Sequence, residues 1–260
     1  MNDPILRPGN GQTFLGPAQR AEAWDRLGAE QFDVVVIGGG VVGAGAALDA
    51  ATRGLSVALV EARDFASGTS SRSSKMFHGG LRYLEQLEFG LVREALHERE
   101  LSLTTLAPHL VKPLPFLFPL TKRVWERPYI AAGIFLYDQL GGAKSVPAQR
   151  HLTKSGALRL APGLKRNSMI GGIRYYDTVV DDARHTMMVA RTAAHYGAVV
   201  RNSTQVVGML TEGDRVVGVT VRDSENGAVT EVRGHVVINA TGVWTDEIQA
   251  LSHQRGRFRV

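Results

Sequence analysis

Four residues in the first quarter of the chain have the types and spacing of a phosphate- and sugar-binding site. Gly38, Gly40 and Gly43 form the pattern G-x-G-x-x-G, and Glu61 follows 23 residues after the first glycine. The first glycine permits a tight turn, the second lets the backbone approach a pyrophosphate, and the third allows close helix–strand packing. A carboxylate at that distance can accept hydrogen bonds from both ribose hydroxyls. The spacing therefore predicts a dinucleotide site, without distinguishing FAD from NAD.

The sequence around these residues predicts two strands and a helix that would hold them together. The β-branched run at residues 33–37 reads as a strand of a parallel sheet covered on both faces. An Ala-rich helix is expected from Val42 to about Arg53, and a second strand at residues 56–60. Strand, helix and strand make one crossover unit, and this context separates the motif from a glycine-rich turn that serves packing alone.

Two further segments favour a bound nucleotide. The sequence Asn-Ala-Thr-Gly at residues 239–242 ends a late strand with small residues, which lets the backbone come close to a ligand. The segment at residues 65–80 is rich in Ser and Gly and lacks helical or strand periodicity. An ordered loop or a fragmentary helix is expected there, and loops of this composition often bind ligands.

The middle of the chain reads as an insertion away from the central sheet. Leu87, Leu91, Leu96 and Leu103 recur at helical spacing and predict an amphipathic helix over residues 84–107. A proline-rich edge strand and a second helix follow, at residues 112–122 and after Pro128.

The last third returns to the pattern of the central sheet. A helix is expected to begin at Asp181 and Asp182 and to stop at Gly197. An antiparallel meander is expected next, and then a final strand before the Asn-Ala-Thr-Gly turn. The strands are predicted at residues 198–210, 215–222, 229–233 and 235–242.

Composition bounds the classes of protein that the chain can belong to. Of its 260 residues 44% are apolar and 21% charged, with a net charge of +5 and no cysteine. Such a chain can bury a core, and it cannot use disulfides, thiolate catalysis or thiolate metal sites. The eight histidines show no metal-binding spacing, and no basic run indicates a nucleic-acid partner. No stretch predicts a signal sequence or a transmembrane helix.

Residues 32 to about 250 resemble the FAD-dependent glycerol-3-phosphate dehydrogenases. The likeness runs from IGGGVVGAGAALDAATRGLSVALVEARDFASGTSS through LAPHLVKPLPFLFP and YDTVVDDARH to NATGVW, and SSKMFHGGLRYLE is its most specific part. The fold it implies is α/β, a Rossmann-like FAD-binding domain of the glutathione-reductase type, with an antiparallel β-meander and part of an α+β substrate domain. The implied division is an N-terminal arm, a first FAD-binding part, a partial substrate domain and a second FAD-binding part, at residues 1–31, 32–111, 112–180 and 181–260.

The resemblance also implies which residues bind ligands. Arg82 and Tyr83 would face the substrate, and a guanidinium fork suits a phosphate dianion. His78 would lie near the isoalloxazine, although a satisfied loop histidine is an equal reading. The residues expected to contact FAD are Gly38, Gly39, Gly40, Gly43, Glu61, Ala62, Thr69, Ser70, Ser73, Ser74, His78, Gly79, Gly80, Leu81, Thr241 and Gly242.

The reaction implied is oxidation of sn-glycerol 3-phosphate to dihydroxyacetone phosphate, with electrons passed from FAD to a quinone. No metal is expected, and the catalytic residue stays unidentified. Quinone reduction implies a cytoplasmic protein attached peripherally to the inner face of the cell membrane, and the stretch KPLPFLFPLTKRVW mixes apolar and basic residues suitably. An edge strand explains that stretch equally well.

The sequence departs from the family in length. Members run to roughly twice this length, and the chain ends at GRFRV as a fresh strand begins, which indicates a truncated product. We therefore expect this chain alone to bind FAD weakly and to turn over little substrate. Two alternatives stay open: another flavoprotein of the same fold that oxidises an amine or a hydroxyacid, and a non-catalytic fragment with an exposed apolar face.

Overall fold

The computed structural model describes residues 15–252 except 78–82, 84–85, 123 and 142–144, and it contains two compact units. Unit 1 comprises residues 1–73 and 182–260, and unit 2 comprises residues 74–181. The division lies after Ser73, whereas the sequence predicted a boundary after residue 111. The difference arises because the helix that follows residue 88 packs within unit 2.

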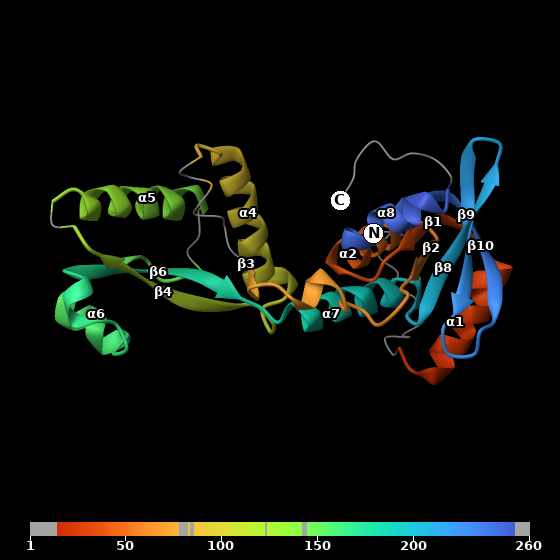
Figure 1. Ribbon diagram of the computed structural model, residues 1–260, viewed down its shortest axis with the longest axis horizontal. Helices are drawn as coiled ribbons and strands as arrows, with labels where there is room; N and C mark the ends of the chain where they lie inside the picture. Colours follow the sequence, from red (N-terminus) through yellow and green to blue (C-terminus); the bar gives the residue numbers. More distant parts are fainter. Residues whose placement is uncertain (1–14, 78–82, 84–85, 123, 142–144, 253–260) are drawn as a thin grey trace, which may run out of the picture. The chain divides into compact units, whose positions relative to one another are not determined.

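Unit 1 is built on a six-stranded sheet with the strand order β7-β2-β1-β10-β9-β8 (Figure 1). Strands β7, β2, β1 and β10 run parallel, and β10, β9 and β8 form the expected antiparallel meander. Its elements are α1 (Pro17–Ala29), β1 (Gln31–Ile37), α2 (Val41–Thr52), β2 (Val57–Val60), η2 (Thr69–Ser71), α7 (Asp182–His195), β7 (Val199–Arg201), β8 (Thr204–Glu212), β9 (Arg215–Asp223), β10 (Val229–Asn239), η5 (Gly242–Trp244) and α8 (Thr245–Ala250).

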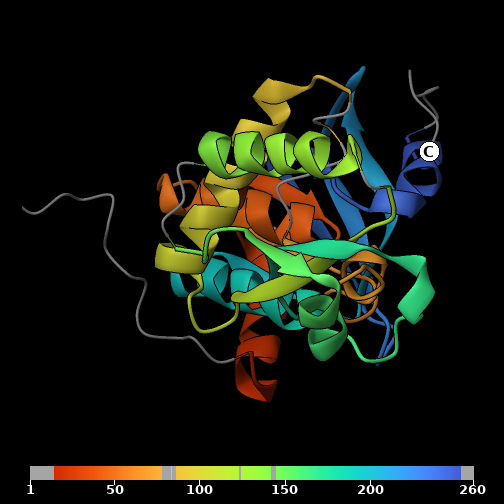
Figure 2. The same ribbon diagram turned by 90° about the vertical axis from the view of Figure 1, so that its left-hand side faces the viewer.

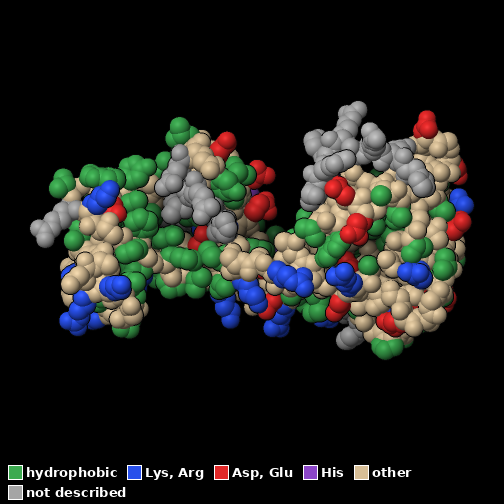
Figure 3. Space-filling view, in the orientation of Figure 1, with side chains coloured by type: hydrophobic (Ala, Val, Ile, Leu, Met, Phe, Trp, Pro, Cys, Tyr) green, Lys and Arg blue, Asp and Glu red, His purple; other side chains and the backbone are tan. Residues whose placement is uncertain are grey.

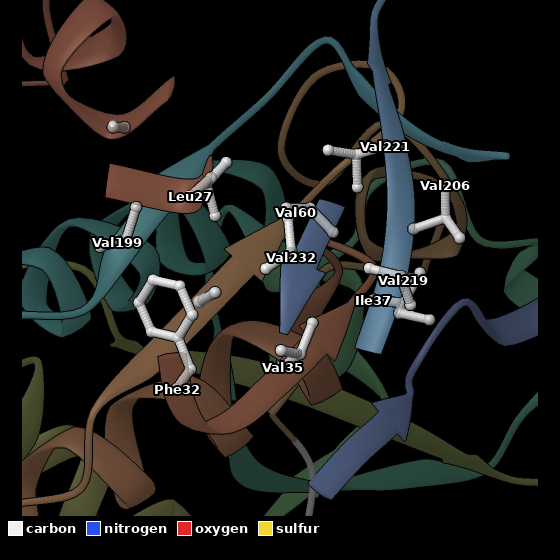
Figure 4. Packing of buried hydrophobic residues seen from close by; sticks show 12 residues of the cluster. Leu27, Phe32, Val35, Ile37, Val60, Val199, Val206, Val219, Val221 and Val232 are labelled. Atoms are coloured by element: carbon white, nitrogen blue, oxygen red, sulfur yellow. The ribbon is translucent and has the colours of Figure 1, made fainter. Parts of the chain in front are cut away.

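Both faces of this sheet are covered, as the unbroken apolar run of β1 predicted. Val34 and Val36 point to a face packed by alanines of α2 and α7. Val35 and Ile37 point to the opposite face, where Leu27 of α1 joins the valines of the meander (Figure 4). The alternation along β1 therefore fixes its carboxyl end between two hydrophobic layers.

Helix α1 was not predicted, since the sequence indicated only an arm before residue 32. Helix α1 buries Ala23 and Leu27. Two buried residues need no long apolar run, so the segment carries little sequence signal for a helix. A charged residue completes its docking: the guanidinium of Arg201 lies 4.6 Å from the ring centre of Trp24. These tertiary contacts, rather than local pattern, hold the helix on the sheet.

Strand β10 joins two segments that the sequence analysis had separated. Residues 229–233 pair antiparallel with β9, and from Arg233 onward the same strand pairs parallel with β1. Gly234 lies between the two predicted strands, and the glycine is required there for close packing: a Cβ would lie 2.6 Å from Cγ2 of Val35. The predicted strand at 198–210 is conversely two strands, separated where Ser203 has a φ of 45°.

Unit 2 is a smaller antiparallel sheet in which β6 pairs with β3, β4 and β5. Helices α4 and α5 lie on one side of the β4–β6 ribbon and α6 on the other (Figures 1 and 2). The expected edge strand is confirmed, since β6 is the one strand that pairs with β4 among the residues that the structure describes. The elements are β3 (Met76–Phe77), α4 (Phe89–Leu101), η3 (Ser102–Leu106), β4 (Lys112–Leu120), α5 (Glu126–Gly141), β5 (Arg150–Thr153), α6 (Lys154–Leu160), η4 (Arg166–Ser168) and β6 (Gly171–Val179).

The predicted face of the helix in unit 2 was wrong at its start. Leu87 is 71% exposed and has a φ of 60°, so the regular helix begins only at Phe89, and Leu91 is also exposed. Leu96 is fully buried, as expected, beside Val92. The same side of the helix carries Arg99, whose guanidinium donates to the buried carboxylate of Asp177 at 3.1 Å. The spacing of the leucines gave no indication of this buried ion pair on the same helix face.

Candidate dinucleotide-binding site

The glycine turn at the end of β1 has a geometry that other residues cannot adopt. Gly38 has a φ of 109°, and its amide donates to the carbonyl of Val60 at 2.9 Å. A Cβ on Gly43 would lie 1.9 Å from the carbonyl oxygen of Gly38. Helix α2 therefore crosses the end of β1 in direct backbone contact, which is the role predicted for the third glycine.

Helix α2 presents a bare N-terminus at this turn. Its N-cap residue, Gly40, is extended and provides no side-chain cap. The Val41 amide donates to Oγ of Ser70 at 2.9 Å. The first amides of a helix lack intrahelical acceptors and carry partial positive charge, so this end of α2 suits a phosphate group.

Glu61 lies against the glycine turn, 22 residues away from it in sequence. Its Oε2 accepts the amide hydrogen of Gly39 at 2.6 Å, and its Oε1 accepts that of Arg63 at 2.8 Å. A carboxylate has about four acceptor directions, so two remain for the hydroxyls of a sugar. The carboxylate is held beside the turn by backbone donors rather than by a cation.

The Asn239–Gly242 turn closes the other side of the site. A Cβ on Gly38 would lie 2.6 Å from the carbonyl oxygen of Ala240, whose amide donates to Ile37 at 2.8 Å. The Thr241 hydroxyl donates to Oδ1 of Asn239 at 2.7 Å. The ends of β1, β2 and β10 therefore meet at one edge of the sheet, which is where open α/β sheets bind ligands.

The Ser-rich loop contributes unevenly to this edge. Ser70 reaches α2 as described, and the exposed Thr69 begins the short helix η2. Ser73 is hydrogen-bonded to the carboxylate of Asp182 at the start of α7. Ser74 begins unit 2, and Ala62 is an exposed residue directly after Glu61. Of these predicted positions, Ser70 is the one that contacts the glycine turn.

The positions predicted for the flavin ring and the substrate fall in the segment 78–83. His78, Gly79, Gly80, Leu81 and Arg82 lie outside the described residues. Tyr83 is described; its side chain is 40% exposed, and its carbonyl accepts the amides of Gln86 and Glu88.

Arg63 and Trp244 are residues of the site that sequence reasoning missed. The Arg63 guanidinium lies 4.9 Å from the ring centre of Trp244, which also packs against Gly68. A cation over an indole ring at this distance is attractive. The stack connects the loop after Glu61 to the turn after β10. The tryptophan of NATGVW was the available signal, and it was used only as part of the motif.

The described residues contain no group of three or more His, Asp or Glu side chains that could hold a metal ion. The described residues at this edge offer glycine amides, hydroxyls and the Glu61 carboxylate. A parallel sheet, a bare helix N-terminus and a carboxylate beside it define the class of dinucleotide-binding α/β proteins.

The chain belongs to the FAD-dependent oxidoreductase family, whose model matches residues 33–259. FAD, rather than NAD, is accordingly the nucleotide of this site. The glycine turn and Glu61 are suited to bind it. The predicted fold class is confirmed at the same time.

Within this family, the chain is similar to proteins named glycerol-3-phosphate dehydrogenase. The chain is 85% identical over 264 residues to "Glycerol-3-phosphate dehydrogenase 2" of Mycobacterium tuberculosis (strain ATCC 25618 / H37Rv), covering 100% of this chain and 45% of that protein. The solved glycerol-3-phosphate dehydrogenase of Bacillus halodurans, complexed with FAD, has a TM-score of 0.69 and 30% identity, over 92% of this chain and 40% of that one. The L-proline dehydrogenase of P. horikoshii (TM-score 0.64, 24% identity, 88% and 57% covered) shares the fold. The chain thus spans less than half the length of the first two.

Proposed function

We propose that this chain is the FAD-binding part of an enzyme that oxidises sn-glycerol 3-phosphate to dihydroxyacetone phosphate. The observation that carries the proposal is the pairing of Glu61 with the glycine turn, in a chain 85% identical to a protein named glycerol-3-phosphate dehydrogenase. The contact between Glu61 and Gly39 supports nucleotide binding. The 85% sequence identity supports glycerol 3-phosphate as the substrate, rather than the substrate of another flavoprotein of this fold.

The residues at the sheet edge have distinct roles in this proposal. The amides at the start of α2 hold the pyrophosphate, and Glu61 accepts the ribose hydroxyls. Ser70 keeps the first turn of α2 against the loop, and the turn at Thr241 and Gly242 lies over the nucleotide. The further predicted contacts are Gly38, Gly39, Gly40, Gly43, Ala62, Thr69, Ser73, Ser74, His78, Gly79, Gly80 and Leu81.

FAD bound at this site would supply the acceptor for the hydride of the substrate's secondary carbinol. The protein's part is to bind the phosphate, to align the carbinol and to receive the hydroxyl proton. Arg82 is proposed to bind the phosphate and Tyr83 to orient the substrate oxygens. The residue that receives the proton is not assigned.

A quinone as electron acceptor and attachment to the membrane surface belong to the same proposal. No helix in the described part of the chain is long and apolar enough to cross a bilayer. The outward side of α5 offers a surface instead, because Tyr129 and Phe135 are 58% and 57% exposed. Figure 3 shows hydrophobic side chains gathered over α5. Trp125, just before α5, is 54% exposed with Lys122 over its ring at 4.8 Å. Aromatic and cationic groups side by side suit a lipid headgroup region.

Two measurements test the proposal at its two levels. Titration of this chain with FAD, followed by flavin fluorescence, tests the site itself. For turnover, residues 1–260 should replace the matching part of the Mycobacterium tuberculosis relative, and glycerol 3-phosphate should bleach the flavin absorbance and yield dihydroxyacetone phosphate. An Arg82→Met chimera should keep its flavin and show a raised KM. A chimera bleached by an amine or a hydroxyacid, and not by glycerol 3-phosphate, would overturn the proposed substrate.

A further inference from the structure

Helix α1 makes a polar contact that its packing on the sheet does not require. Nη1 of Arg20 donates to both the carbonyl oxygen and Oδ1 of Asn202, at 2.6 and 2.7 Å. Asn202 lies between β7 and β8, 182 residues away in sequence. A fork of two short bonds from one guanidinium to one residue fixes both the backbone and the side chain of Asn202.

Asn202 passes this constraint to the loop that follows β2. Its Nδ2 donates to Oδ1 of Asp64 at 3.0 Å. With its amide oxygen bound to Arg20, the side chain of Asn202 has its nitrogen directed at Asp64. The chain Arg20–Asn202–Asp64 therefore joins α1 to the loop that contains Glu61.

The backbone of the β7–β8 turn reinforces the same connection. The amide of Thr204 donates to the carbonyl of Glu61 and that of Ser203 to the carbonyl of Arg63, each at 2.7 Å. The amide of Glu61 donates in turn to the carbonyl of Arg201 at 2.9 Å. Three backbone bonds thus flank the carboxylate that lies beside the glycine turn.

The base of this connection is buried and charged. Arg20 also reaches Oδ1 of Asp223 at 3.1 Å, while Nη2 of Arg201 binds Oδ2 of the same carboxylate at 2.7 Å. The side chains of Arg201 and Asp223 are each 4% exposed. Nη2 of Arg20 is therefore fixed by Asp223, and Nη1 is directed at Asn202.

We propose that Arg20 is a positioning residue of the cofactor site: through Asn202 and Asp64 it sets the loop from Glu61 to Asp64, so that docking of α1 and binding of the nucleotide are coupled. The inference deepens the proposed function, since the ligand is the FAD proposed for this site. Coupling between two sites is reciprocal, so bound FAD must also stabilise the docked α1.

The test compares three variants of the chain with the parent. Arg20→Met removes the fork and keeps an apolar side chain on the sheet. Asn202→Asp keeps the acceptor for Arg20 and places a second carboxylate against Asp64, which breaks the connection while α1 stays anchored. Arg26→Met is the matched control, because Arg26 lies on the same helix and its guanidinium pairs at the surface with Glu30.

Hydrogen exchange without cofactor gives the first readout. The amides of Ser203 and Thr204 should exchange about 10-fold faster in Arg20→Met and in Asn202→Asp, because local opening sets their exchange rate. The exchange of α1 amides should rise in Arg20→Met alone. Exchange at Ser203 and Thr204 no faster in either variant than in Arg26→Met would overturn the inference.

FAD titration gives the second readout and separates this inference from the proposed function. The dissociation constant should rise about 5-fold in Arg20→Met and in Asn202→Asp, the size expected for one lost hydrogen-bonded contact. Saturating FAD should slow exchange of α1 in the parent and not in Asn202→Asp. Unchanged affinity in both variants, with a parent that binds FAD, would overturn the positioning role alone. A parent that binds no FAD, either alone or within the chimera, refutes both the proposed function and the coupling.

Discussion

Glu61 accepts the amide hydrogen of Gly39 across 2.6 Å, at the edge where β1 and β2 end side by side. The contact joins the two parts of the motif that the sequence shows only as a spacing of 22 residues. It places a carboxylate within reach of the sugar next to any diphosphate held by the N-terminus of α2.

Replacing Glu61 by Gln is expected to weaken FAD binding about 10-fold, which corresponds to about 1.4 kcal/mol. The amide keeps one oxygen and turns its NH2 group toward either Gly39 or Arg63, whose amides are both donors. Flavin fluorescence titration measures the change. Glu212→Gln is the control, since Glu212 is 71% exposed and its pairing with Arg233 spans 3.7 Å. Equal affinity in the two variants would remove Glu61 from the site.

Gly43→Ala should destabilise the chain by about 1–3 kcal/mol, the usual cost of overpacking. The new Cβ would meet the carbonyl oxygen of Gly38, which belongs to backbone and cannot move aside as a side chain could. Gly45→Ala lies in the same helix with nothing within 4 Å, so it should stabilise by about 0.5–1 kcal/mol. Urea unfolding of both variants measures the difference. The same sign of change in both would contradict the close contact.

The crossover unit was predictable because each of its residues obeys a local rule. The apolar run of β1, the alanines of α2 and the glycines between them each have one favourable place, so residues 33–60 follow the expected pattern to within two residues. For the turn at residues 239–242 the sequence predicted close approach to a ligand, and the structure adds its contact with Gly38 through Ala240. Small residues at both turns permit backbone approach whatever the distance in sequence.

Other features depend on partners distant in sequence and carry no local signal. Arg20 binds Asn202 across 182 residues, and nothing in the first thirty residues indicates that contact. Gly234 lies between two predicted strands, and its close packing against Val35 has no local signal. The apolar spacing at Leu87 and Leu91 is that of a buried helix face, yet both side chains are exposed. Tertiary packing overrides local preference in each case.

Asp223→Asn should lower the free energy of unfolding by about 3–5 kcal/mol near neutral pH, because it leaves Arg201 charged and buried without its partner. Burial raises the pKa of the Asp223 carboxyl, but the Glu225 amide, Arg201 and Arg20 outweigh it and hold that pKa below the usual 3.8. A lowered folded-state pKa gives stability that is present above the unfolded value and is lost as the pH falls through the folded one.

The parent and the Asp223→Asn variant should therefore converge in stability as the pH falls below 3.8. Urea unfolding at a series of pH values measures both curves. Asp25→Asn serves as a control for loss of an exposed carboxylate, in helix α1. A gap between the curves that stays constant through the acid range would show that the ion pair does not supply the difference.

The outward side of α5 should determine binding to lipid vesicles. The ten residues from Pro128 to Tyr137 carry no charge, and α5 buries Ile134 and Tyr137 on one side while Tyr129 and Phe135 face outward. A helix that is apolar on both sides requires a partner for its outer side. Phe135→Ser should lower the fraction of protein that sediments with phosphatidylglycerol vesicles several-fold, because it removes apolar area from the contact without changing the buried side.

Leu160→Ser is the matched control for this surface. Leu160 is 51% exposed at the end of α6, in the same unit, so the substitution removes a similar exposed side chain from another helix. Its vesicle binding should equal that of the parent.

Lys122→Gln should make the vesicle binding of the protein less sensitive to salt, because Lys122 supplies charge beside Trp125 rather than apolar area. Equal losses in Phe135→Ser and Leu160→Ser would mean that the protein adheres to vesicles without using α5.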